Sequence, residues 1–167
     1  MITLNSLENY LKKWFFNAKK IVIAGIGNSM RKDDAIGIEI VKKLAGKTPS
    51  HVYLLECENV PENFIGAIER INPTHILLID SGQLNASPGS FALISPEQIG
   101  GISISTHTLP LSIFIKYIKQ TINAKVIALV IQPKSLSFGR GLSKEVKKAR
   151  DILAKKLLET LQSLFME

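Results

Sequence analysis

Four residues, in three separate segments of the chain, carry side chains that can hold a metal ion or move a proton. Asp33 and Asp34 follow the glycine turn at residues 25–28, Asp80 ends an apolar run, and His107 precedes a helical pattern. Carboxylate oxygens with one imidazole nitrogen form a mixed ligand set that suits zinc, nickel, iron or manganese. Three protein ligands leave coordination positions open for water or substrate. Asp34, Asp80 and His107 are therefore the candidate metal-binding and catalytic residues.

The acidic pair also has a purely structural interpretation. A dinucleotide fingerprint fails because Met30 stands where a third glycine is required, and no Gly-Lys-Ser/Thr loop is present to cradle phosphate. Two carboxylates repel phosphate and suit a cation. Equally, Asp33 or Asp34 could cap the helix that starts near residue 35. Both interpretations stay open on spacing alone.

The positions of these residues depend on an alternation of apolar runs and helical patterns. Strands are expected at 21–24, 51–56, 75–80, 90–94 and 125–132, and helices at 4–17, 34–46, about 61–71, 109–121 and 144–165. The pattern predicts an α/β fold, a three-layer sandwich with a mixed, mostly parallel sheet of about five strands and helices on both faces. The strand at 90–94 arrives without a helical crossover, so it is expected to pair antiparallel at an edge.

Parallel strands place the candidate residues at one edge of this sheet. Ligands of open α/β sheets bind at the carboxyl ends of the strands, where Asp34, Asp80 and His107 are expected to meet. His51 and His75 begin strands, so they belong to the opposite edge.

Composition limits the classes of partner and compartment. A chain of 167 residues predicts one domain, 1–167, with residues 1–19 as a helical extension at its N-terminus. The single cysteine, Cys57, excludes an intrachain disulfide and favours a reducing cytoplasm.

The net charge of +7 permits nucleic-acid binding, but the lysines gather on predicted helices without interleaved aromatics, so no nucleic-acid partner is expected. No segment is typical of a signal peptide or a membrane span.

An ordered set of short motifs spans residues 20–160. It consists of Gly25-Ile-Gly-Asn28 with Asp33-Asp34-Ala-Ile-Gly37, Val60-Pro-Glu-Asn63, Leu77-Leu-Ile-Asp80, Ser105-Thr-His107 with Leu109-Pro110-Leu111, and Ile131-Gln-Pro133. In this order the motifs resemble the hydrogenase maturation endopeptidases, most closely the formate-hydrogenlyase type.

The resemblance implies a function and a set of site residues. It implies an endopeptidase with a metal-linked, aspartic-type site that removes a C-terminal extension from a [NiFe]-hydrogenase large-subunit precursor after nickel insertion. Its three metal-binding positions fall on Asp34, Asp80 and His107, and a fourth acidic position falls on Glu56, where formate-hydrogenlyase relatives carry Asp. The helix at 4–17 extends beyond the usual start of the family.

Two versions of the mechanism remain. Either the three residues grip nickel already held by the precursor, which the resemblance favours, or the protein holds a divalent metal of its own. In both a water is the expected nucleophile. The alternative from another class is a non-catalytic, nickel-sensing maturation chaperone, and a metal-dependent phosphohydrolase is disfavoured because no lysine or glycine loop is placed to hold phosphate. The expected partner is the precursor alone, with the protein acting as a cytoplasmic monomer.

Overall fold

The architecture is built on one mixed β-sheet. A computed structural model describes residues 3–98 and 111–165, and in these ranges the sheet has five strands in the order β2-β1-β3-β5-β4. The strands are β1 (Ile21–Ile26), β2 (Val52–Glu58), β3 (His75–Ser81), β4 (Phe91–Ile94) and β5 (Lys125–Ile131). All neighbours pair in parallel except β4, which pairs antiparallel with β5 at the edge. The predicted mixed, mostly parallel sheet is confirmed.

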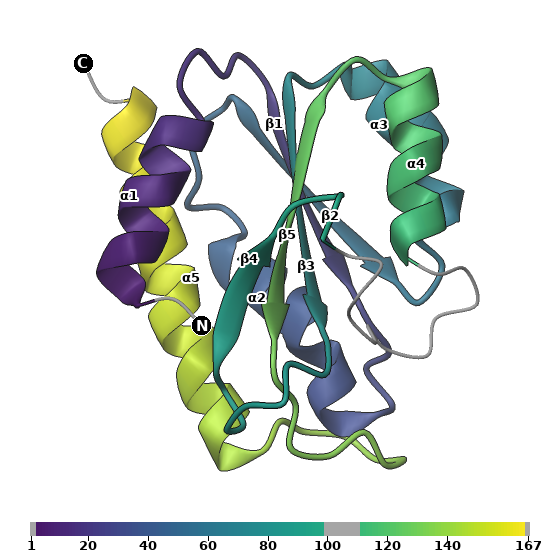
Figure 1. The fold of residues 1–167 in the computed structure, drawn as a ribbon, viewed down its shortest axis with the longest axis vertical. Helices are drawn as coiled ribbons and strands as arrows, with labels where there is room; N and C mark the ends of the chain where they lie inside the picture. The colour runs from purple at the N-terminus through teal and green to yellow at the C-terminus, as the bar shows by residue number, and fades with distance from the viewer. Residues whose placement is uncertain (1–2, 99–110, 166–167) are drawn as a thin grey trace.

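Helices cover both faces of the sheet (Figure 1). One face carries α1 (Leu4–Trp14), α2 (Ile36–Leu44) and α5 (Lys144–Phe165), and the other carries α3 (Ile65–Ile71) and α4 (Leu111–Thr121). Two short 3-10 helices, η1 (Lys32–Ala35) and η2 (Pro61–Phe64), lead into α2 and α3. Among these described helices, none is long and apolar enough to cross a membrane.

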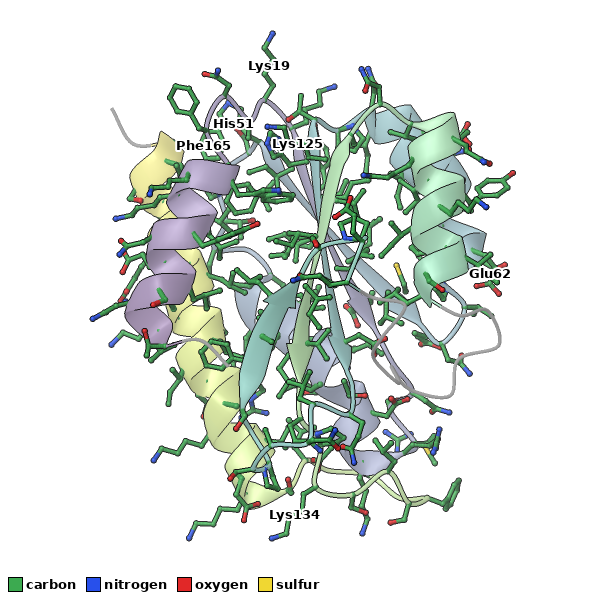
Figure 2. The ribbon with its side chains drawn as sticks, in the orientation of Figure 1. Lys19, His51, Glu62, Lys125, Lys134 and Phe165 are labelled. Carbon is green, nitrogen blue, oxygen red and sulfur yellow. The ribbon has the colours of Figure 1, made fainter. Side chains whose placement is uncertain are left out.

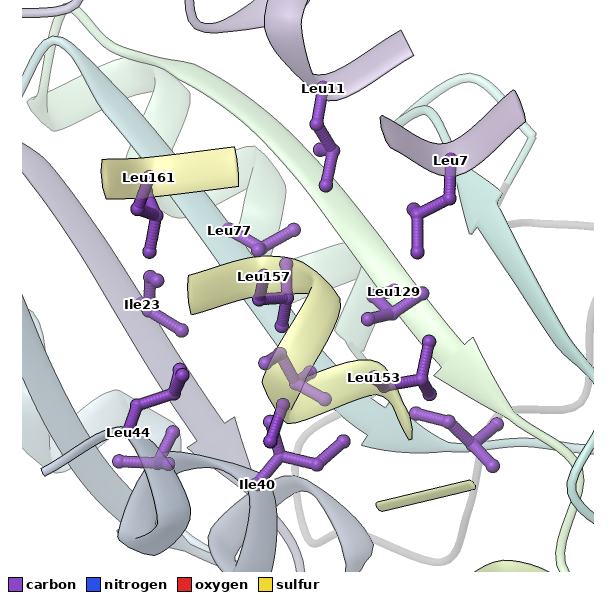
Figure 3. Close-up of a cluster of buried hydrophobic side chains, with 14 of the residues drawn as sticks. Leu7, Leu11, Ile23, Ile40, Leu44, Leu77, Leu129, Leu153, Leu157 and Leu161 are labelled. Carbon is purple, nitrogen blue, oxygen red and sulfur yellow. The ribbon is translucent and has the colours of Figure 1, made fainter. Parts of the chain in front are cut away.

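The side-chain alternation of the strands divides the interior into two cores. Ile23, Leu77 and Leu129 point to the face with α1, α2 and α5, whereas Val22 and Ile76 point to the face with α3 and α4. Figure 3 shows the first core, where leucines of α1, α2 and α5 meet the sheet. Because β1 and β3 are buried on both faces, their sequences are almost continuously apolar, as expected of central parallel strands.

The N-terminal helix belongs to the first core. Leu7 and Leu11 of α1 are fully buried against it, and Glu8 forms an ion pair with Lys156 of α5 at 3.2 Å. Residues 4–14 are thus packed on the last helix, and Trp14 ends the helix three residues before the expected position.

The two ends of the parallel strands lie at opposite edges of the molecule. The loops that follow β1, β3 and β5 lie at the lower edge in Figure 1. His75 begins β3 at the other edge, beneath the rings of Trp14 and Phe15, and His51 stacks on Phe165 there. Figure 2 shows His51 and Phe165 at the edge opposite Lys134. Both histidines therefore lie away from the candidate site, as predicted.

Candidate active site

Asp34 lies in η1, directly beyond the turn that follows β1, and its side chain is 1% exposed. Its Oδ2 accepts a hydrogen bond from the backbone N–H of Asn28 at 3.0 Å. Its Oδ1 accepts one from the hydroxyl of Ser81 at 2.8 Å. The carboxylate is therefore held in one orientation from two sides, by the turn and by the end of β3.

Ser81 connects Asp34 with the second predicted carboxylate, Asp80. While the Ser81 hydroxyl donates to Asp34, its backbone N–H donates to Oδ1 of Asp80 at 2.8 Å. Asp80 and Ser81 are both fully buried at the carboxyl end of β3. Successive strand residues face opposite ways, so Asp80 continues the side of Leu78, toward α4, and Ser81 continues the side of Ile79, toward α2. The structure thus joins Asp34 by a hydrogen bond to Ser81, the residue that follows Asp80 at the end of β3.

Two glycines make this close approach possible. A Cβ at Gly27, whose φ is 151°, would collide with the carbonyl oxygen of Asp34. A Cβ at Gly37 would collide with the carbonyl oxygen of Ile79, the residue before Asp80. The start of α2 therefore lies directly against the ends of β1 and β3, which a side chain at either glycine would prevent.

The neighbouring Asp33 has a different role. Its Oδ2 accepts hydrogen bonds from the backbone N–H groups of Lys134 and Ser135 and from the Ser143 hydroxyl, at 2.8, 3.0 and 2.9 Å. Its Oδ1 accepts from the backbone N–H of Ser143 at 2.7 Å. Asp33 is fully buried and holds both ends of the loop at 134–143 against η1.

The helix-cap interpretation of the acidic pair is wrong. The N-cap positions of η1 and α2 are Arg31 and Ala35, and neither has a side-chain capping bond. Instead, the carboxylate of Asp34 accepts a hydrogen bond from Ser81, and the carboxylate of Asp33 accepts hydrogen bonds from the loop at 134–143.

His107 lies outside the described residues, so its predicted role stays a prediction. The described chain resumes at Leu111, where α4 begins at the same edge as Asp34 and Asp80. Within residues 3–98 and 111–165, no three His, Cys, Asp or Glu side chains form a group that could hold a metal ion. The predicted metal site of Asp34, Asp80 and His107 therefore depends on His107 as its third ligand.

Glu56 is exposed on the edge strand β2, where it pairs in register with Gly25. In the described part of the chain its side chain forms no hydrogen bond or ion pair with another residue. Its predicted catalytic role is neither supported nor contradicted by this position, and it stays a prediction.

Cys57 is unsuited to act as a nucleophile. Its side chain is fully buried in the second core, and this burial raises the pKa of the thiol to about 12. Because the thiolate is the reactive form, Cys57 is a core residue at neutral pH.

The chemistry of the site follows from its donor set. Each oxygen of Asp34 accepts one hydrogen bond and keeps a second lone pair for another partner. A buried carboxylate such as that of Asp34, which is held by the neutral donors of Asn28 and Ser81, can bind a divalent cation or accept a proton from a bound water. Asp80 is also fully buried, so both residues have the chemistry that the carboxylate part of a metal-linked hydrolytic site requires.

Comparisons with known proteins agree with this architecture. A family model described as HycI, hydrogenase maturation protease, matches residues 38–160. A putative hydrogenase maturation protease of Methanocaldococcus jannaschii is 43% identical over 156 residues, covering 89% of this chain and 92% of the relative. The hydrogenase 3 maturation protease of Escherichia coli K12 is 31% identical over 137 residues, covering 81% and 87%. The crystal structure of the [NiFe] hydrogenase maturation protease HycI from Thermococcus kodakarensis superposes with a TM-score of 0.84 at 30% identity, covering 92% of this chain and 99% of that chain. The chain belongs to the hydrogenase maturation protease family.

Proposed function

We propose that this protein is an endopeptidase that removes the C-terminal extension of a [NiFe]-hydrogenase large-subunit precursor after nickel has been inserted. The observation that carries the proposal is the bridge through Ser81, which fixes two buried carboxylates at the strand ends. The relative named a hydrogenase 3 maturation protease supports a formate-hydrogenlyase-type client. In this proposal the protein acts as a monomer in the cytoplasm.

The proposed mechanism divides the work among four residues. Asp34, Asp80 and His107 grip the nickel that the precursor carries, so the metal belongs to the substrate and reports completed insertion. A carboxylate of the site takes a proton from the attacking water and returns it to the leaving amine. Glu56, near the carboxyl end of β2, is the fourth residue of the site in this proposal.

A processing assay tests the proposal. The protein is mixed with purified precursor, nickel-loaded or nickel-free, and the products are weighed by mass spectrometry. We expect loss of one discrete C-terminal peptide from the loaded precursor only. Nickel-dependent binding without cleavage would replace the endopeptidase with the nickel-sensing chaperone. Equal cleavage of both precursors would remove nickel as the recognition element and favour a divalent metal held by the protein itself.

The isosteric change Asp34→Asn tests the carboxylate directly. We expect it to abolish processing, because a neutral amide neither holds the cation nor accepts the proton, while its carbonyl oxygen keeps one acceptor for the surrounding donors. Glu69→Gln, an equivalent change at an exposed residue of α3, serves as the control and is expected to process normally. Normal cleavage by the Asp34→Asn variant would remove this residue from the mechanism.

A further inference from the structure

A pocket of about 300 Å³ opens directly beside the segment that carries Asp34. It is bordered by Ala35, the residue after Asp34, and by Ser29 of the preceding turn. Its ionisable lining consists of one carboxylate, Glu39, and four cations, Lys42, Arg140, Lys147 and Arg150. The pocket therefore carries an excess of positive charge close to the candidate active site.

The cations of this pocket are incompletely neutralised. Glu39 stands 3.9 Å from both Lys42 Nζ and Arg150 Nη1, at the limit of an ion pair. Arg150 also forms an ion pair through its Nε with Oδ1 of Asp151, at 2.9 Å, and Asp151 does not line the pocket. Arg140 and Lys147 are exposed and form no ion pair with any residue in the described ranges. Two cations are thus available to an incoming anionic group.

The positive surface continues on the other side of Arg140. A second pocket, of about 460 Å³, shares Arg140, Gly141 and Leu142 with the first and adds the cations Lys32 and Lys144. It also adds Lys134, which is paired with Glu145 at 3.0 Å. Asp33 also borders this second pocket, but its carboxylate already accepts four hydrogen bonds. We call these two adjoining pockets the Arg140 surface. Positively charged side chains therefore line both pockets, with Arg140 shared between them.

The backbone beneath the Arg140 surface is fixed to the candidate active site. Besides the bonds to Asp33, the N–H of Lys32 donates to the carbonyl of Gly139 at 2.9 Å, and the N–H of Gly139 donates to that of Met30 at 2.8 Å. Gly139 and Gly141, with φ of 140° and 98°, allow the turns that these contacts require. An anionic ligand held here would consequently keep a constant position relative to Asp34, with little ordering cost on binding.

We propose that the Arg140 surface binds an acidic segment of the precursor polypeptide and so orients the precursor over Asp34 and Asp80. The identity of the partner rests on the proposed function. A polypeptide is the occupant that fits, because the chain belongs to a protease family and the positive charge flanks the segment that bears Asp34. In an extended acidic segment of the precursor, successive carboxylates can reach the two pockets on either side of Arg140.

Charge-reversal variants distinguish the effect of the Arg140 surface on precursor binding from the effect of the protein's net positive charge. The variant Arg140→Glu/Lys147→Glu is compared with Lys19→Glu/Lys47→Glu, which changes the net charge equally. Lys19 lies at the edge opposite Lys134 in Figure 2, and Lys47 is three residues beyond Leu44, where α2 ends. The dissociation constant of the nickel-loaded precursor is measured with each full-length variant over a range of salt concentration. All four positions are exposed and free of ion pairs with described residues, so the variants are expected to fold.

We expect the Arg140→Glu/Lys147→Glu variant to bind the precursor at least about tenfold more weakly and with a shallower salt dependence, because interfacial charges act through complementarity that salt screens. The Lys19→Glu/Lys47→Glu variant should change binding by less than about twofold. Glu39→Gln removes the one carboxylate of the first pocket and should have the opposite effect, tightening binding.

Two outcomes would overturn this inference, and neither affects the proposed function. One is equal weakening by both double variants, which would assign the effect to net charge. The other is unchanged binding by the Arg140→Glu/Lys147→Glu variant. Conversely, selective weakening by that variant, together with no cleavage by the wild-type protein, would retain the Arg140 surface and overturn the endopeptidase.

Discussion

The hydroxyl oxygen of Ser81 and Oδ1 of Asp34 are 2.8 Å apart, and both side chains are shielded from water. A carboxylate in such a place depends strongly on each donor that it retains, because no solvent replaces a donor that is removed. Ser81 also donates its backbone N–H to Asp80, so one residue contacts both carboxylates.

Ser81→Ala removes only the hydroxyl donor and keeps the backbone bond to Asp80. We expect it to lower the free energy of unfolding by about 1–3 kcal/mol, the cost of leaving a buried acceptor unpaired. The turnover number for precursor processing should fall about ten- to a hundredfold, as when a residue that orients a metal ligand is lost. Urea denaturation and the processing assay measure the two effects.

Thr160→Val is the matched control for this change. Thr160 is also fully buried, and its hydroxyl donates to the carbonyl of Lys156 in α5, far from the candidate site. We expect a loss of stability with an unchanged turnover number. A similar loss of turnover in both variants would reduce the role of Ser81 to general stability.

The environment of His75 makes the stability of the folded protein depend on pH. Burial of its ring, together with the charge of Lys125, lowers the pKa of His75 below its usual 6.5, and the carbonyl of Trp14 opposes this only in part. The unfolded chain therefore takes up a proton at higher pH than the folded protein does. Above about pH 6.5 neither state is protonated, and stability is lost as the pH falls from 6.5 toward the lower folded pKa.

The His75→Gln variant should lose less stability than the wild-type protein between about pH 7 and pH 5. Urea denaturation at several pH values measures the slope. A wild-type slope for His75→Gln would contradict the assignment.

The loop at 134–143 shows how one buried side chain organises an element far away in the sequence. Asp33→Ala would leave three backbone N–H groups and one hydroxyl of this loop without their acceptor. Because part of the loop can regain water, we expect a loss of only about 2 kcal/mol of stability. In hydrogen exchange, the amides of Lys134, Ser135 and Ser143 should lose protection. The amide of Gly139, which donates to Met30, provides an internal reference that should stay protected if the loop remains attached.

Local pattern was sufficient to predict the elements and the edge of the sheet at which Asp34 and Asp80 lie. Buried strands such as β3 are short apolar runs with a polar residue at the end, and their alternation with helical periodicity fixes a mostly parallel sheet. The same reasoning failed for the acidic pair, since Asp33 and Asp34 bind donors that lie 101–110 and 47 residues further along the chain. Ser81 was missed for the same reason, because nothing in the neighbouring sequence distinguishes a bridging serine from a turn residue.

At the level of the whole molecule, α1 is part of the framework. Its leucines lie in the first core between α5 and the sheet (Figure 3), and Phe15 beyond its end is 2% exposed. These contacts make α1 a packing element of the first core.

Leu11→Ala tests how far the fold depends on this helix. We expect it to cost about 2–5 kcal/mol, the usual range for a buried leucine replaced by alanine. Tyr10→Ala, at the adjacent and 47% exposed position, should cost less than about 1 kcal/mol. Thermal and urea denaturation measure both values, and a small effect of Leu11→Ala would mean that α1 is dispensable for stability.

The order in which the strands pair has a consequence for synthesis on the ribosome. β1, β2 and β3 are neighbours in the sheet and are complete by Ser81, so a nascent chain can pair them early. The first core, however, is closed by leucines of α5, and the acceptors on Asp33 are filled only by residues 134–143. A nascent protein that has paired its central strands therefore still lacks the loop that borders the candidate site. In this architecture, the candidate site is completed only after residues 134–143 and α5 have been synthesised.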